Sequence, residues 1–206
     1  MKRYIVFLKQ VPQSTRVEID PITKTLKRSS ALCKTNPDDL CALQAALNLK
    51  KKTGAEIVAV SMGPAKAENV LREALQHGAD RAILLSSRAF AGSDTWCTST
   101  VLAAAVRKIG SYDILFFGRM AIDGDTAQVG PQISEHLNIP VISYAQKIRE
   151  VNEAEKYIVV ERQYDDRYHV VKAQLPCLLT ALAELNEPRY MTPGGIFDAY
   201  DAEITT

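Results

Sequence analysis

The segment from Gly118 to Pro131 carries the residues best suited to chemistry. It follows an apolar run at 113–117, which predicts a buried strand, and it precedes a helical pattern at 132–137. Such a loop can bind a nucleotide, because the ligand lies beyond the strand and the helix N-terminus offers unpaired N–H groups to phosphate. Thr126 adds a hydroxyl donor. The alternative is an ordinary turn, but this loop exceeds the roughly two to six residues usual for such connections.

Other chemistry has little support in the sequence. We find no G-x-S-x-G elbow, no Walker A lysine, no paired histidines and no G-x-G-x-x-G after the first strand, and we assign no catalytic residue. Asp123 and Asp125 are candidate metal ligands, but no third ligand is near, so we expect loop or ribose hydrogen bonds and no metal. Trp96 and Phe90 are candidates for stacking on an aromatic ligand, with core packing as the alternative.

Bulk composition narrows the class of protein further. The 206 residues carry a net charge of +1, which gives no basic field for nucleic acid. No apolar run approaches the roughly 20 residues of a membrane-spanning helix. Met1-Lys2-Arg3 leads directly into a strand-like run instead of a signal peptide, and four scattered cysteines are typical of reduced thiols. We therefore expect a cytoplasmic protein without membrane insertion.

Strand-like and helix-like segments alternate over about the first two-thirds of the chain, which predicts a doubly wound, mainly parallel α/β sheet. A small surface hairpin is expected at 17–27, an antiparallel hairpin at 157–171, and an exposed loop from Asn186 onward. The expected strands are 4–8, 56–60, 81–85, 113–117, 141–144 and 177–180, and the expected helices are 37–52, 67–75, 101–109 and 132–137.

Several polar or glycine-bearing segments follow the predicted parallel strands. Ligands of such sheets bind beyond the carboxyl ends of the strands. The helix start at 36–39 carries an N-cap asparagine, an N1 proline and two aspartates, and we expect it to approach the same edge. The segments that we place there are 9–10, 62–64, 92–95 and 118–130.

The order and spacing of these motifs make the chain resemble the beta subunit of electron-transfer flavoprotein over essentially its whole length. The matching landmarks are 6–12, 36–39, 60–64, 78–82, 90–95, 121–131 and 175–190. The resemblance implies an adenine-nucleotide-binding fold and a heterodimer in which the alpha subunit binds one FAD.

The nucleotide of the beta subunit differs between two types of these proteins. Housekeeping members hold AMP in a structural role. Bifurcating members hold a second FAD, which accepts a hydride from NADH and sends one electron to ferredoxin or flavodoxin and the other to an acyl-CoA dehydrogenase. Gly124 and Ala127 make the loop similar to the bifurcating type, and 191–195 resembles members that work with butyryl-CoA dehydrogenase. The alternatives are a housekeeping subunit with AMP and a non-redox nucleotide-binding adaptor.

The resemblance also assigns roles to individual residues. Phosphates are expected on the loop, adenine against Phe7 and Met62, and the isoalloxazine ring near Asp94 and Thr95, while Met120 replaces a glutamine of many members. The cofactor-binding positions are Phe7, Asn36, Asp39, Met62, Asp94, Thr95, Gly118, Arg119, Met120, Ala121, Asp123, Gly124, Asp125, Thr126, Gln128 and Val129.

We divide the chain into a nucleotide-binding domain at 1–185 and a partner-docking segment at 186–206. In housekeeping members a leucine of this segment anchors the dehydrogenase, and Pro193 stands at that position here. Docking is therefore expected to use Tyr190, Met191, Pro193 and Ile196. The chain ends earlier than members of the family usually do, which suggests a shortened C-terminal arm.

Overall fold

A computed structural model describes residues 2–13 and 32–206, so the hairpin expected at 17–27 lies outside the described residues. The strands are β1 (Arg3–Phe7), β2 (Gln10–Pro12), β3 (Cys33–Thr35), β4 (Glu56–Met62), β5 (Arg81–Leu85), β6 (Ile114–Gly118), β7 (Val141–Asn152), β8 (Tyr157–Gln163), β9 (Tyr168–Gln174), β10 (Cys177–Ala181) and β11 (Ile204–Thr205). The α-helices are α1 (Pro37–Thr53), α2 (Glu68–His77), α3 (Thr95–Ile109), α4 (Val129–Leu137) and α5 (Pro193–Tyr200). Short 3-10 turns lie at η1 (Ala65–Ala67), η2 (Arg88–Phe90) and η3 (Ala183–Leu185).

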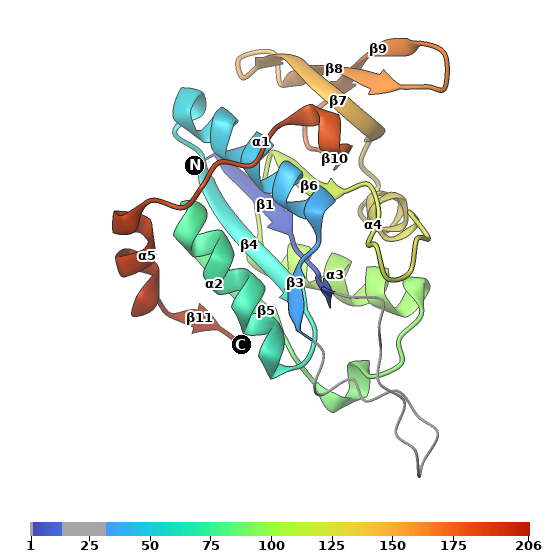
Figure 1. The fold of residues 1–206 in the computed structure, drawn as a ribbon. Coiled ribbons are helices and arrows are strands. Elements are labelled where there is room, and N and C mark those ends of the chain that lie inside the picture. The colour runs from blue at the N-terminus through green and yellow to red at the C-terminus, as the bar shows by residue number, and fades with distance from the viewer. Residues whose placement is uncertain (1, 14–31) are drawn as a thin grey trace.

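One nine-stranded sheet forms the centre of the fold (Figure 1). Its order is β11-β5-β4-β1-β6-β10-β7-β8-β9, and the strands from β11 to β7 run parallel. β8 and β9 pair antiparallel beyond β7, where the sequence predicted a hairpin. The chain leaves β1 toward β4 and later crosses to β6, so β1 and β6 flank the topological switch point at which such sheets bind ligands.

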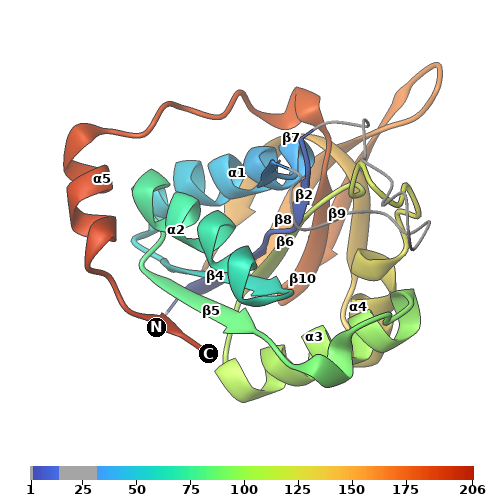
Figure 2. The same cartoon turned by 60° about the horizontal axis from the view of Figure 1, so that its bottom comes forward.

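Helices cover both faces of the sheet, with α1 and α2 on one side and α3 and α4 on the other (Figure 2). One apolar core lies between the sheet and helices α1 and α2, and it includes Val6, Leu43 and Leu71. A second lies between the sheet and helices α3 and α4, and it includes Ile5, Val106 and Ile133. Continuous apolar strands alternating with amphipathic helices can bury their side chains only in this arrangement. The predicted doubly wound α/β fold is confirmed.

The tail differs from the exposed loop that the sequence predicted. Residues 193–200 form α5, and β11 adds a parallel edge strand beside β5. Arg72 of α2 donates hydrogen bonds to the carbonyls of Ala199, Tyr200 and Ala202, which ties the end of α5 to the body. Thr192 caps the helix by accepting from the Gly195 N–H at 3.1 Å. The prolines and glycines of this segment favour a loop in the sequence. A Thr-Pro pair such as Thr192-Pro193 is also a common helix start, because threonine caps the helix and proline fits its first position.

Helix α1 begins as predicted, with Pro37 in its first turn and Asn36 at the N-cap position. The Asn36 side chain does not cap the helix, however, and makes its hydrogen bonds elsewhere. Gly54 ends the helix in the left-handed conformation, with φ of 67°. The N-terminal end of α1 lies at the carboxyl ends of β1 and β6, and Figure 1 shows α1 lying over β6.

Candidate functional site

A cavity of about 270 Å³ opens at the carboxyl ends of β1, β4 and β6. It brings together most of the predicted cofactor-binding residues from five separate stretches of the chain. Those that line it are Phe7, Asp39, Met62, Asp94, Thr95, Gly118, Arg119, Met120, Ala121, Gly124, Asp125, Thr126, Gln128 and Val129. Asn36 and Asp123 are the predicted residues that do not line it. Leu8, Lys9, Val60, Ser93, Thr98, Leu102, Phe117, Ala127 and Gly130 line it as well.

The loop between β6 and α4 has a backbone suited to an anion. Asp125 and Ala127 adopt left-handed conformations, with φ of 48° and 51°. Gln128 returns to the right-handed region, and α4 begins at Val129. A left-handed residue followed by a right-handed one, as at Ala127 and Gln128, is the backbone conformation of an anion-binding nest, and here it stands at the N-terminus of α4. This geometry is the physical basis for placing phosphate here.

The two glycines of the loop serve different purposes. A Cβ on Gly124 would meet no atom within 4 Å, so this position faces open space at the cavity. A Cβ on Gly130 would lie 3.0 Å from the Thr180 methyl group, which shows that Gly130 allows α4 to pack closely on β10. Gly124 therefore keeps the cavity mouth free, whereas Gly130 leaves room for the close contact of α4 with β10.

Asn36 shapes the loop from behind instead of facing the cavity. Its side chain is fully buried, donates to the Met120 carbonyl at 2.9 Å, and accepts from the Ile122 N–H at 3.2 Å. Both halves of the amide are thus bonded to the main chain of the loop. Asn36 supports the loop through these bonds, and its contact with a nucleotide stays a prediction.

Two cationic side chains approach the cavity. Lys9, directly after β1, places Nζ 2.7 Å from the Asp123 carboxylate, so the end of β1 is joined to the loop. Arg119 lies 3.6 Å from Asp38. Asp38 is half-buried, and that burial raises the pKa of its carboxyl above the ordinary value. The sequence predicts that Lys9 lies at this edge, because Lys9 follows a predicted parallel strand, but it predicts no role for the side chain.

An apolar floor lies beneath the polar rim. The rings of Phe7 and Phe117 stack with centroids 4.1 Å apart and planes at 12°, and Val60 and Leu102 line the same cavity. An adenine or flavin ring could rest on such a floor through dispersion and apolar burial. Phe7 and Met62 both line the cavity, and their packing on adenine stays a prediction.

The start of α3 closes the opposite side of the cavity. Asp94 accepts from the Cys97 N–H at 2.7 Å, and this hydrogen bond lowers the pKa of the Asp94 carboxyl. The Thr95 hydroxyl lies 3.1 Å from Gln128 Oε1 and accepts from Gln132 Nε2 at 3.3 Å, so it links α3 to α4. These contacts fix the wall without occupying the cavity.

The aromatic residues near α3 do not reach the ligand space. Trp96 packs on the His136 ring with centroids 4.6 Å apart and is 59% exposed, and neither Trp96 nor Phe90 lines the cavity. The cavity lining therefore gives no support to their stacking on a ligand, which stays a prediction. Within residues 2–13 and 32–206 no group of three acidic, histidine or cysteine side chains is arranged to hold a metal.

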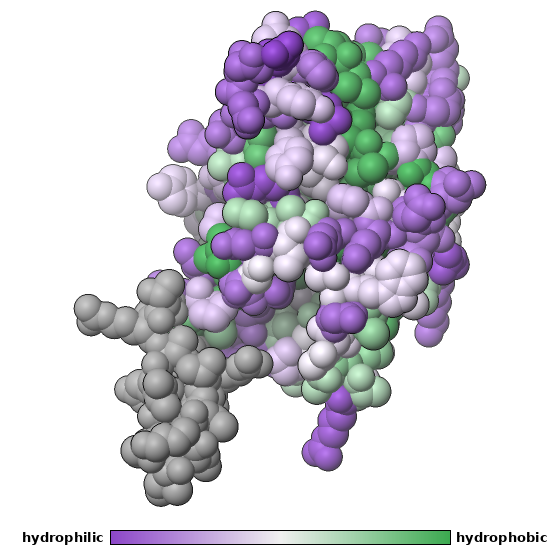
Figure 3. All heavy atoms as spheres, turned by 90° about the vertical axis from the view of Figure 1, so that its right-hand side faces the viewer, coloured by the Kyte–Doolittle hydropathy of each residue, from purple (hydrophilic) through white to green (hydrophobic). Residues whose placement is uncertain are grey.

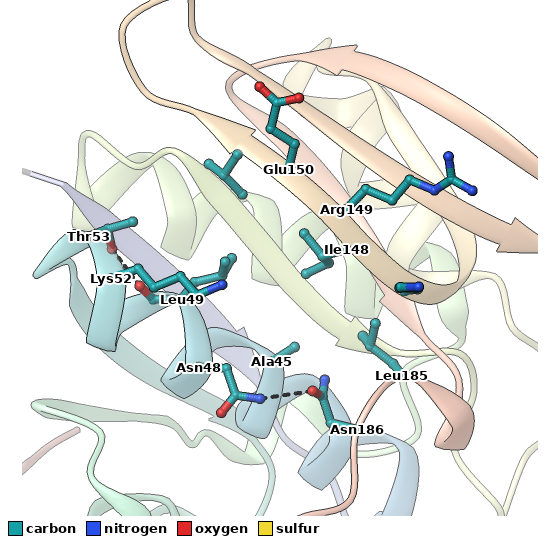
Figure 4. A pocket seen from close by; sticks show the side chains of 12 residues that line it. Ala45, Asn48, Leu49, Lys52, Thr53, Ile148, Arg149, Glu150, Leu185 and Asn186 are labelled. Atoms are coloured by element: carbon teal, nitrogen blue, oxygen red, sulfur yellow. Dashed lines mark hydrogen bonds between the residues drawn. The ribbon is translucent and has the colours of Figure 1, made fainter.

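A second cavity, of about 470 Å³, lies between α1 and β7 (Figure 4). Leu49, Ile148 and Leu185 line it with apolar atoms, and Asn48 donates to Asn186 at 2.9 Å at its edge. It is formed by the second half of α1, whereas the first cavity adjoins the start of that helix. None of the predicted cofactor-binding residues lines it.

The amino-acid sequence of the chain is similar to those of known proteins. A model of the electron transfer flavoprotein domain family matches residues 23–206. A subunit named CarD of the caffeyl-CoA reductase-Etf complex of Acetobacterium woodii is 50% identical over 204 residues, covering 98% of this chain and 77% of that protein. The chain belongs to the electron transfer flavoprotein family.

Two further relatives specify the type of subunit. The electron transfer flavoprotein subunit beta of Thermoanaerobacterium thermosaccharolyticum is 51% identical, over 96% of this chain and 74% of that subunit. The acryloyl-CoA reductase electron transfer subunit gamma of Anaerotignum propionicum is 44% identical, over 98% and 76%. This chain is an electron transfer flavoprotein subunit of the beta type, and the predicted resemblance is confirmed. None of the helices in the described part of this flavoprotein subunit has the length and apolarity needed to span a lipid bilayer.

Proposed function

We propose that the cavity between β1, β6 and α3 binds FAD and that, together with a flavoprotein alpha subunit, the chain takes electrons from NADH. The observation that carries this proposal is the loop at 118–130, which sets a nest of N–H groups, an open Gly124 and the cation of Lys9 around an apolar floor. The names of two relatives associate them with caffeyl-CoA reductase and acryloyl-CoA reductase, which supports an enzyme that acts on acyl-CoA compounds as the electron partner.

The residues present fit the parts of such a ligand. The backbone N–H groups at 127–129 and the ammonium of Lys9 would hold the pyrophosphate, and Phe7 and Met62 would pack on adenine. The start of α3 at Asp94 and Thr95 would lie along the isoalloxazine ring. Bound FAD supplies hydride acceptance and release of single electrons, whereas the chain binds, orients and shields the ring.

A housekeeping role with structural AMP is the second candidate. The cavity volume of about 270 Å³ favours it, because FAD is about twice the size of AMP and ligand cavities commonly reach 300–1,000 Å³. AMP would use the same phosphate nest and apolar floor. The two candidates therefore differ in whether the ligand extends along α3.

We propose that α5 and the residues before it dock an acyl-CoA dehydrogenase. Tyr190 is 95% exposed, and Met191, Pro193 and Ile196 are exposed around the start of α5. Two further aromatic side chains on α5 were not among the predicted docking residues. Phe197 is 78% exposed and Tyr200 is 79% exposed. Exposed aromatic residues grouped on an anchored helix are typical of protein interfaces.

We further propose that the alpha subunit contacts the extension formed by β7, β8 and β9. Hydrophobic side chains gather in a band over the upper part of the face shown in Figure 3, where this extension lies. Tyr164, Tyr168 and Val170 are about half-exposed there, and β9 is the edge strand of the sheet. An exposed edge strand with aromatic residues is suited to pairing with another chain.

The functional proposal is tested with NADH. The chain is co-produced with a flavoprotein alpha subunit, purified and mixed anaerobically with NADH while flavin absorbance is followed. Bleaching of both flavins is the expected result. In a second mixture that also contains ferredoxin or flavodoxin and the acyl-CoA dehydrogenase, NADH should reduce the ferredoxin or flavodoxin only when a crotonyl-CoA-type acceptor is present, because the dehydrogenase delivers the other electrons to that acceptor. A complex that is reduced by acyl-CoA dehydrogenase but not by NADH would instead establish the AMP-bound housekeeping role.

A further inference from the structure

The carboxylate of Asp39 joins the ends of two neighbouring strands. One oxygen, Oδ2, accepts from the backbone N–H of Lys9 at 2.8 Å, and Oδ1 accepts from the backbone N–H of Gly118 at 3.0 Å. Lys9 follows β1 and Gly118 ends β6, and these strands flank the topological switch point. Asp39 therefore bridges the crevice in which a ligand of this fold lies.

Space at this bridge is tightly restricted. Asp39 is only 7% exposed, and a Cβ on Gly118 would lie 2.3 Å from Asp39 Oδ1 and 2.8 Å from the main-chain carbon of Asp38. Glycine at 118 thus permits the end of β6 to approach α1, and the carboxylate then fixes the distance. A buried carboxylate is costly unless its oxygens are hydrogen-bonded, so its presence here needs a reason beyond packing.

We propose that Asp39 is a positioning residue that sets the width of the nucleotide cavity. By holding Lys9 and Gly118, it fixes the strand end that carries Phe7 and the first residue of the phosphate loop relative to each other. The charged groups nearest to it are Asp38, Lys9 and Arg119, all at the same edge of the sheet. This inference rests on the proposed binding of an adenine nucleotide in the cavity.

Asp80 provides a matched control on the opposite edge of the sheet. Its Oδ2 accepts from the backbone N–H of Ile57, near the start of β4, at 2.8 Å, and its Oδ1 pairs with Lys50. It does not line the nucleotide cavity. Asp80→Asn therefore weakens the same kind of carboxylate-to-strand bond without touching the site.

The experiment compares Asp39→Asn, Asp80→Asn and the unchanged chain in AMP and FAD titrations, with melting temperature and amide hydrogen exchange measured in parallel. In Asp39→Asn an NH₂ group faces one of the two strand N–H groups. We expect nucleotide affinity to fall by roughly ten- to a hundredfold, with faster exchange at Lys9 or Gly118. Asp80→Asn should keep the affinity of the unchanged chain.

Two results would overturn the inference: an Asp39→Asn chain that binds nucleotide as tightly as the unchanged chain, or an Asp80→Asn chain that loses as much affinity. If Asp39→Asn does not fold, Asp39→Ser gives a second test, because its shorter side chain can accept from at most one of the two strand N–H groups, and retained affinity in that variant would contradict the inference. Failure of the unchanged chain to bind either AMP or FAD is a different outcome, which removes the proposed nucleotide site itself.

Discussion

The ammonium group of Lys9 lies 2.7 Å from Oδ1 of Asp123, across the mouth of the cavity. The pair connects the end of β1 to the loop between β6 and α4. Both side chains are partly exposed, at 50% and 31%, and exposed ion pairs contribute only about 0–1 kcal/mol. A phosphate in the loop can therefore compete with Asp123 for Lys9 at little cost.

The first prediction concerns this pair. Lys9→Gln should weaken nucleotide binding by roughly tenfold, since a hydrogen bond to a charged group contributes about 1.5–3 kcal/mol. Asp123→Asn should strengthen binding at low salt, because Lys9 is then free for phosphate. Calorimetric titration at two salt concentrations measures both effects. Lys156→Gln, which breaks the Lys156–Asp113 pair away from the cavity, should change nothing.

The second prediction concerns Gly124, whose missing side chain leaves the cavity mouth open. Gly124→Asp should leave the melting temperature unchanged, since a Cβ there meets no atom within 4 Å. It should nevertheless weaken FAD binding, because a carboxylate is placed beside the phosphate nest. Thr126→Ala should also weaken binding by removing a hydroxyl donor. Gly194→Asp is the control, as that glycine is equally unobstructed but lies on α5. Unchanged flavin content in both loop variants would contradict this interpretation.

The third prediction follows from the buried carboxyl of Asp39. Burial raises its pKa from 3.8 to about 7, so the folded chain binds a proton there more tightly than the unfolded chain. This contribution to stability is fully present below the unfolded pKa near 4 and is lost as the pH rises through about 7. The free energy of unfolding of the unchanged chain, minus that of Asp39→Asn, should therefore fall between about pH 4 and about pH 7 by up to about 1.4 kcal/mol per pH unit, and level off above that range.

Denaturant titrations at several pH values check this difference. Subtraction matters because burial lowers the pKa of His77, and that group changes stability in the opposite direction as its own pKa range is crossed. A difference that stays constant with pH would show that the carboxyl of Asp39 is already ionised throughout.

The fourth prediction concerns the exposed aromatic side chains of α5. Phe197→Ser and Tyr200→Ser should each slow electron exchange with an acyl-CoA dehydrogenase by roughly tenfold, since aromatic residues dominate interface energies. Neither change should alter the melting temperature, because both side chains are more than three-quarters exposed. Stopped-flow kinetics with the dehydrogenase measures the effect. Leu32→Ser, at an exposed apolar side chain outside both α5 and the β7–β9 extension, should leave that rate unchanged.

The sheet was predictable because its signals are local. Apolar strands such as 114–118 alternate with helices that begin at residues like Pro37 and end at Gly54, and parallel strands then bring the intervening loops to one edge. That rule alone predicted most of the segments that line the cavity. Helix α5 was missed because Pro193 and two glycines have two meanings, and only the anchorage by Arg72 decides between them.

Roles within the site were less predictable than membership of it. Asn36 and Asp39 were expected to contact the nucleotide, yet their polar atoms are bonded to main chain that lies far away in sequence. Lys9 was predicted at this edge of the sheet, but its ion pair with Asp123 and the position of Phe117 in the cavity had no local sequence signal. Such long-range hydrogen bonds and contacts depend on the tertiary structure, which residue spacing does not specify.

One measurement tests the central claim most directly: the identity and number of nucleotides released from the purified heterodimer. After denaturation, the supernatant is separated by chromatography and quantified against protein. We expect two FAD for each heterodimer and no AMP, falling to one FAD in Gly124→Asp. One FAD and one AMP for each heterodimer would contradict this expectation and would make the cavity at Gly118–Gly130 a structural AMP site.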